Sequence, residues 1–255
     1  MAGSIRAEQD GAVATVLLDR PAKHNAMTAA MFGELAEVLQ RVAREPSARV
    51  VVLAGEGPSF CAGLDLHAGI NGDRPGDVET PLAVMRGAVA VPVWLREMPQ
   101  PVIAAVQGHA VGAGFALAAA SDLRIAAPDV EFNSVFTSIG MTPGDLGLSW
   151  FLPRIIGLTD SSEIFYRSQI VNGDRAMDLR LVNEIVDDPR ERAQQIAHEI
   201  ADMSPIAIQQ TKALINSTMQ VDGFRRHLEL EMRTQVLCSM TEQHEAARDA
   251  FLARR

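Results

Sequence analysis

Cysteine is scarce in this chain, with Cys61 and Cys238 as the only two among 255 residues. Two cysteines so far apart form neither a disulfide framework nor a metal-ligand spacing. No other metal-binding motif and no nucleotide-phosphate motif is found. The sequence therefore predicts no bound metal and a protein of a reducing compartment, in which both cysteines pack as small apolar side chains.

Positive charge and long apolar runs are also lacking. The formal net charge is −9 at pH 7, and there is no basic run of the kind that binds nucleic acid. No segment is long and apolar enough to cross a bilayer, and the N-terminus has no signal-peptide pattern. We therefore expect a cytoplasmic protein without nucleic-acid or membrane partners. The hydrophobic content of 47% is enough for a sizeable core.

The order of elements predicts an α/β chain in two parts. Residues 5–9 and 13–18 are β-rich and flank Asp10-Gly11, which predicts a hairpin, and apolar spacing predicts a helix within 25–44. Strand-then-helix units recur at 50–54, 102–106 and 123–127, as expected for an α/β fold. From about residue 193 the pattern is helical, and Pro205 opens one helix. We expect a core over 1–192 and a helical region over 193–255.

One strand-like run passes through glycines straight into an alanine-rich helix. The run 103–106 is followed by Gly108, Gly112 and Gly114 and then by alanines. A helix whose first turn carries glycine and alanine presents bare backbone N–H groups, which suit a developing negative charge on a carbonyl oxygen. The alternative is a turn in which glycine only permits tight packing.

A second stretch of the same character lies upstream. The apolar run 50–54 precedes Cys61-Ala62-Gly63-Leu64-Asp65, where small residues again leave N–H groups exposed. Two such turns can supply the two converging donors that an enolate or tetrahedral oxyanion needs, each worth about 2.7 to 4 kcal/mol in the transition state. The pair of turns favours oxyanion chemistry over packing alone.

With the segments around them, these turns resemble the enoyl-CoA hydratase/isomerase (crotonase) superfamily. The matching segments are Arg20-Pro21-Ala22-Lys23-His24-Asn25-Ala26-Met27 before the turns, and Pro143-Gly144-Asp145 and Leu152-Pro153-Arg154-Ile155-Ile156-Gly157 after them. The resemblance implies a crotonase-like ββα spiral core with a C-terminal helical oligomerisation region. It further implies an acyl-CoA thioester as substrate, coenzyme A entering only as part of it, and a homotrimer or dimer of trimers.

Site residues carry over from the resemblance by position. The oxyanion donors implied are the backbone N–H groups of Ala62 and Ala113. The implied substrate and CoA contacts are Lys23, His24, Ala62, Gly63, Leu64, Asp65, Gly112, Phe136 and Arg254. Lys23 and His24 have the alternative of a solvated surface pair, and Asp65 that of capping backbone N–H groups.

Two departures from the family limit the reaction. The family's hydratases add water with a pair of glutamates, and at those positions this chain has Ala116 and Phe136, neither of which transfers a proton. Hydration by that pair is therefore not expected. Apolar residues within 84–94 and 132–150 are the candidates for the lining of an acyl pocket.

Asp145 is the one carboxylate left in this neighbourhood. It lies where the resemblance places the catalytic aspartate of some dienoyl-CoA isomerases, and apolar walls would raise its pKa into a useful range. Its alternative role is an N-cap or Asx-turn at the next helix. We interpret the chain as an isomerase-type enzyme with Asp145 as proton shuttle. The alternatives are a weakly active acyl-CoA binding protein and a hydratase with a non-standard acid or base.

Overall fold

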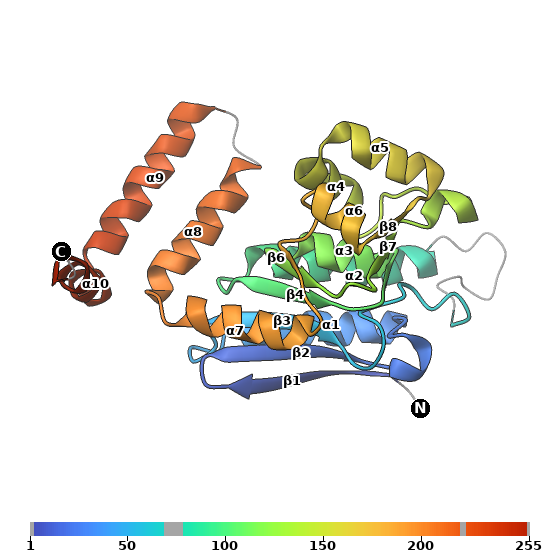
Figure 1. The fold of residues 1–255 in the computed structure, drawn as a ribbon, viewed down its shortest axis with the longest axis horizontal. Helices are drawn as coiled ribbons and strands as arrows, with labels where there is room; N and C mark the ends of the chain where they lie inside the picture. The colour runs from blue at the N-terminus through green and yellow to red at the C-terminus, as the bar shows by residue number, and fades with distance from the viewer. Residues whose placement is uncertain (1–2, 69–78, 220–222, 254–255) are drawn as a thin grey trace.

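The centre of the fold is a six-stranded sheet with the order β1-β2-β3-β4-β6-β9 (Figure 1). The computed structural model describes residues 3–68, 79–219 and 223–253. The strands of this sheet are β1 (Ser4–Asp10), β2 (Val13–Asp19), β3 (Val50–Gly55), β4 (Val102–Val106), β6 (Leu123–Ala126) and β9 (Glu184–Ile185). The predicted hairpin is confirmed, since β1 and β2 pair antiparallel, and the other neighbours in this sheet are parallel.

Helices cover both faces of this sheet. One face packs against α1 (Ala29–Ala43), α2 (Glu79–Glu97) and α3 (Ala113–Ala120), and the other against α7 (Pro189–Ala201). Along β3, Val51 faces the first group while Val50 and Val52 face α7. A parallel strand covered on both sides must be apolar at every position, which explains the uninterrupted apolar run of β3.

A second, three-stranded sheet has the order β5-β7-β8. Its strands are β5 (His109–Val111), β7 (Glu131–Asn133) and β8 (Ile170–Asn172). Gly108 joins β4 to β5 at a φ of 52°, and a Cβ atom there would lie 2.2 Å from the Pro58 carbonyl oxygen, so only glycine fits this turn. The succession β4, β5, α3 is a ββα unit of the kind that the family resemblance implies.

The other helices that precede β9 are short. They are η1 (Pro21–Lys23), η2 (Phe136–Ile139), α4 (Leu148–Ile156), α5 (Leu158–Arg167) and α6 (Gly173–Asp178). The helix α4 packs against α3, whose first turn belongs to the candidate site.

The last three helices extend to one side of the sheet (Figure 1). They are α8 (Pro205–Thr218), α9 (Phe224–Ser239) and α10 (Glu242–Ala253), and Pro205 is the first residue of its helix, as predicted. The boundary expected at residue 193 falls inside α7, whose buried alanines pack on the sheet. In the described parts of the chain, no helix is long and apolar enough to cross a membrane.

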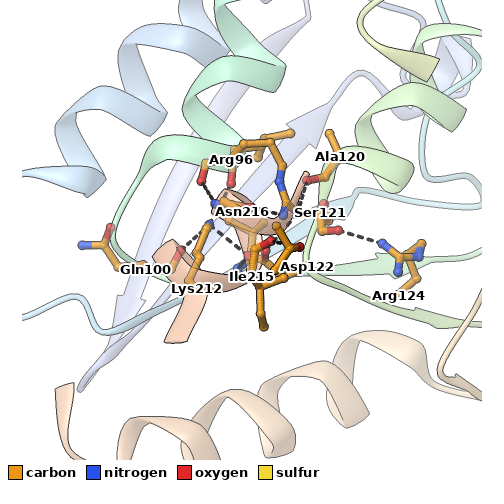
Figure 2. Close-up of polar contacts among 12 residues, drawn as sticks. Arg96, Gln100, Ala120, Ser121, Asp122, Arg124, Lys212, Ile215 and Asn216 are labelled. Carbon is orange, nitrogen blue, oxygen red and sulfur yellow. Dashed lines mark hydrogen bonds and ion pairs between the residues drawn. The ribbon is translucent and has the colours of Figure 1, made fainter. Parts of the chain in front are cut away.

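A buried polar cluster fastens α8 to the core (Figure 2). The ammonium group of Lys212 donates to the carbonyl oxygens of Leu95 and Gln100, both at 2.8 Å, and lies 2.9 Å from Oδ2 of Asp122. One turn along α8, the Asn216 amide donates to the Arg96 carbonyl oxygen at 2.6 Å. The charge of Lys212 is therefore buried with a full set of acceptors, as a buried charge requires.

Candidate active site

The turn that begins at Cys61 is fastened to β5. The Cys61 N–H donates to the His109 carbonyl oxygen at 2.9 Å, and the Val111 N–H donates to the Cys61 carbonyl oxygen at 2.9 Å. A Cβ atom on Gly114 would lie 2.1 Å from that same Cys61 oxygen, so glycine is what allows α3 to begin this close. The structure thus brings together the two glycine turns that the sequence predicted.

On its other side the turn pairs with Met27, and this pairing leaves the N–H of Leu64 without a partner. Met27 donates its N–H to the Gly63 carbonyl oxygen at 2.7 Å and accepts the Asp65 N–H at 2.8 Å. In a parallel bridge of this kind, both bonds belong to Met27, so the N–H of the opposite residue, Leu64, points away from it. Within the described residues, the Leu64 N–H has no hydrogen-bond acceptor.

Ala62 does not present its N–H in the way that the sequence led us to expect. That N–H donates to the carbonyl oxygen of His24 at 2.9 Å, so it is not available to a second oxygen. The expectation for Ala62 is therefore corrected, and the donor that remains on this turn is two residues further on, at Leu64.

Ala113 begins α3 and keeps its N–H unpaired among the described residues. The residue before it, Gly112, has a φ of 53°, offers no side chain to cap the helix, and donates its own N–H to the Asn133 carbonyl oxygen at 2.8 Å. A Cβ atom on Gly63 would lie 3.5 Å from the Ala113 nitrogen and 2.7 Å from the Val111 oxygen. The backbone that carries the Leu64 N–H is thus in contact with the start of α3.

The carboxylate of Asp65 is committed to structure. It lies 2.6 Å from a guanidinium nitrogen of Arg20 and accepts the N–H groups of His67 and Ala68 at 3.0 and 3.3 Å. The hydrogen bond from Arg20 is the main cause that lowers the pKa of Asp65. Asp65 caps backbone donors, which was the alternative to substrate binding.

Asn25 is a residue of this site that the sequence analysis did not single out. It is fully buried at a φ of 56°, and its amide nitrogen donates to the carbonyl oxygens of Glu56, Ser59 and Phe60 at 2.9, 2.7 and 3.2 Å. Asparagine tolerates this left-handed backbone better than most residues. Its side chain holds the chain that leads into the Cys61 turn.

Lys23 and His24 lie exposed at the end of η1, beside the site. His24 takes part in the site through its carbonyl oxygen, which holds Ala62, and through its ring, whose Nδ1 lies 2.9 Å from Oγ of Ser59. Arg254, the remaining predicted contact, lies outside the described residues.

The two positions where the family's hydratases have glutamates are apolar and buried. Ala116 is fully buried inside α3, and Phe136 is 6% exposed at the start of η2. A Cβ atom on Gly112 would lie 3.6 Å from the tip of the Phe136 ring, so this ring borders the first turn of α3. Neither position offers a group that can move a proton.

Asp145 does not cap the helix that follows it. The helix α4 has Gly147 as its N-cap and no side-chain capping bond. Burial raises the pKa of the Asp145 carboxyl group, and a hydrogen bond from the Leu146 N–H opposes this shift. A carboxyl group with a raised pKa is suited to accept and return a proton near neutral pH.

A cavity of about 260 Å³ is lined in part by Leu146, the residue that follows Asp145 in the chain, and by the polar side chains of Arg96, Glu97 and Asn216. Both ranges expected to form an acyl pocket contribute to its lining, with Val89 and Val93 from α2 and with Leu146 and Trp150 from the α4 region. The walls are mainly apolar, as in sites that hold a hydrocarbon group.

The thiol of Cys61 is shielded from chemistry. It is fully buried, and this burial raises its pKa to about 12. A thiol in this state is not a nucleophile at neutral pH. In the part of the chain that the structure describes, no three metal-ligating side chains come together.

Known proteins are similar to this chain in sequence and in fold. The sequence model described as enoyl-CoA hydratase/isomerase matches residues 8–255. The 1,2-epoxyphenylacetyl-CoA isomerase of Escherichia coli K12 is 32% identical over 95% of this chain and 93% of its own length. The crotonyl-CoA hydratase of Syntrophomonas wolfei is 31% identical over 97% and 94%. An enoyl-CoA hydratase structure from Polaromonas sp. JS666 superposes with a TM-score of 0.93 at 30% identity, covering 99% of this chain and 98% of that one. The chain belongs to the enoyl-CoA hydratase/isomerase family.

Proposed function

We propose that this protein moves a proton on an acyl-CoA thioester through an enolate, most simply to shift a double bond. The observation that carries the proposal is the pair of unpaired N–H groups, on Leu64 and Ala113, at two turns in contact with each other. When the thioester loses a proton next to its carbonyl group, negative charge collects on the carbonyl oxygen. Two fixed donors stabilise that oxygen, each by about 2.7 to 4 kcal/mol.

Asp145 is the group that we assign to the proton. Its carboxylate takes a proton from one carbon, the electron pair passes to the thioester oxygen, and the same carboxyl group returns the proton to another carbon. Support comes from the raised pKa of Asp145 and from the absence of an acid at positions 116 and 136. One relative is named 1,2-epoxyphenylacetyl-CoA isomerase, and we assign an acyl group of that aromatic kind to the mainly apolar cavity beside Leu146.

Hydration is the second candidate, because one relative is named crotonyl-CoA hydratase. In that reaction Asp145 alone would direct the attacking water and supply the proton to the α-carbon. The oxyanion role of Leu64 and Ala113 is the same in both reactions, so product analysis separates them.

Coenzyme A enters this site as part of the substrate. We assign the exposed Lys23 and the His24 beside it to the polyanionic end of CoA, and Arg254 to the same end by the family resemblance. An acidic protein needs local cations such as Lys23 and Arg254, because its overall field repels an anion.

We further propose a homotrimer or a dimer of trimers. Large apolar side chains are exposed on α9, with Phe224 at 77%, Met232 at 62% and Val236 at 53%. Light scattering during gel filtration tests this assembly, and a monomeric mass would refute it.

The first experiment incubates the protein with enoyl-, dienoyl- and aryl-CoA thioesters in deuterated water and follows deuterium uptake and products by mass spectrometry. Asp145→Asn is expected to abolish exchange while thioester binding persists. A shifted double bond identifies isomerisation, and a mass gain of one water identifies hydration. Tight binding of thioesters without exchange or turnover would refute the enzyme and favour a binding protein.

The Ala113 donor is tested by a backbone change. Because Ala113 is the first residue of α3, proline fits there but lacks the N–H. Ala113→Pro is expected to lower kcat about 10²- to 10³-fold, whereas the control Ala113→Gly keeps the N–H and is expected to retain most activity. Equal activity of the two variants would exclude this donor.

A further inference from the structure

A buried serine hydroxyl lies between two histidine rings beside the Cys61 turn. Ser59 is fully buried, and its Oγ lies 2.9 Å from Nδ1 of His24 and 3.0 Å from Nδ1 of His109. The two rings meet edge to face with their centroids 5.3 Å apart. On its outer side, Nε2 of His109 lies 3.7 Å from a carboxylate oxygen of Glu131. Ser59 thus ties the end of η1 to the start of β5.

These three side chains satisfy one another. A serine hydroxyl has one proton to donate and two lone pairs with which to accept. In the neutral cluster, one histidine Nδ1 accepts the Ser59 proton, and the other histidine donates its Nδ1–H to Oγ. Each group therefore has a partner, and a buried hydroxyl with satisfied partners has one preferred position.

The same two histidines hold the turn through their backbones. The His24 carbonyl oxygen accepts the Ala62 N–H, and the His109 carbonyl oxygen accepts the Cys61 N–H, both at 2.9 Å. His24 lies three residues before Met27, which fixes the orientation of Leu64. His109 begins β5 and lies four residues before the Ala113 donor. The histidines therefore belong to the two segments that set the positions of the two donors.

We propose that Ser59, His24 and His109 form a brace that fixes the position of the Leu64 N–H relative to the Ala113 N–H. Ser59 is a positioning residue, since it is buried behind the turn and acts on the substrate only through the backbone. This inference rests on the oxyanion role proposed above. The brace stabilises the donor geometry that the transition state needs, and a misplacement of about 1 Å in such geometry costs up to about 10²-fold in rate.

Ser59→Ala removes the brace with the smallest change of volume. We expect kcat for deuterium exchange to fall about 10-fold or more, with a smaller change in KM, because Lys23 and Arg254, which we assign to CoA together with His24, lie outside the brace. Ser161→Ala is the matched control, because Ser161 is an equally buried serine in α5, away from the turn. Ser59→Thr keeps the hydroxyl, so we expect its kcat to lie between the values of Ser59→Ala and wild type.

Hydrogen–deuterium exchange of the backbone gives a readout that does not depend on activity. Peptides covering 60–66 are expected to exchange faster in Ser59→Ala than in wild type, and those of α5 to be unchanged. If Ser59→Ala fails to fold, His109→Phe removes one arm of the brace at a half-exposed ring and takes its place. Unchanged kcat and unchanged exchange in 60–66 would overturn the brace, as would a loss confined to KM. Faster exchange in 60–66 in a protein whose wild type processes no thioester would support the brace and refute the proposed function.

Discussion

Removing the ammonium group of Lys212 is expected to cost the protein a large share of its stability. The Lys212 residue is 5% exposed, and its three hydrogen-bond partners are the carbonyl oxygens of Leu95 and Gln100 and one carboxylate oxygen of Asp122. In Lys212→Met the two carbonyl oxygens lose their side-chain donor, at about 1 to 3 kcal/mol for each group left unsatisfied. Asp122 keeps the Arg96 guanidinium at 3.0 Å and the Val102 N–H at 2.8 Å, so its charge stays paired.

The expected loss in free energy of unfolding is therefore about 2 to 4 kcal/mol, taken from the lower half of that range because the desolvation cost of the ammonium disappears with it. Urea unfolding followed by circular dichroism measures the loss. Arg192→Met is the matched control, because it breaks a more exposed ion pair with Glu184, and we expect it to cost less than about 1 kcal/mol. A loss below about 1 kcal/mol in Lys212→Met would show that the cluster in Figure 2 does not anchor α8.

Three further outcomes are expected. Arg180 has a φ of 55° at the end of α6, where glycine is favoured, so Arg180→Gly should raise the free energy of unfolding by up to about 1 kcal/mol, and a lower melting temperature would contradict this. Burial raises the pKa of Asp145, so the stability that its proton contributes is lost as pH rises through that pKa. Asp145→Asn should therefore be more stable than wild type at pH 7 and lose this advantage below about pH 4 in urea unfolding. Iodoacetamide should modify Cys238 in the folded protein but not Cys61, whose pKa is about 12, and peptide mass spectrometry would reveal a labelled Cys61.

Local sequence was enough to predict several of the elements, and pairing between distant segments was needed to place the donors. The hairpin around Gly11 and the buried strand β3 follow from turn chemistry and from apolar runs. The identity of the donor on the Cys61 turn cannot be predicted in this way, because Ala62 and Leu64 both have small or apolar neighbours. The two residues differ because the Ala62 N–H donates to the His24 carbonyl oxygen, whereas the pairing of Met27 with Gly63 and Asp65 leaves the Leu64 N–H pointing away and, among the described residues, unpaired.

The role of α7 is hard to predict from the sequence for a related reason. The residues of α7 that contact the sheet are alanines, which also suit an exposed helix, so the sequence gives little sign that α7 covers a face of the sheet. Lys212 is similar, since a lysine in a helix usually lies in water. Its burial follows from three acceptors contributed by α2, by the segment between α2 and β4, and by the loop after α3.

Backbone pairing determines where the Leu64 N–H lies, and this pairing depends on Gly63, because the residue at that position of the turn cannot carry a side chain. Its φ is 88°, and an added Cβ atom would lie 2.7 Å from the Val111 oxygen, so Gly63→Ala must displace the turn from β5. That displacement moves the Leu64 N–H, and we expect kcat to fall at least about 10-fold with a smaller change in KM. Gly33→Ala is the control, because Gly33 lies in α1 with open space around it, and there alanine should add up to about 1 kcal/mol of stability. A Gly63→Ala variant with wild-type kcat would mean that the position of this turn does not govern the reaction, and the donor would have to be sought elsewhere.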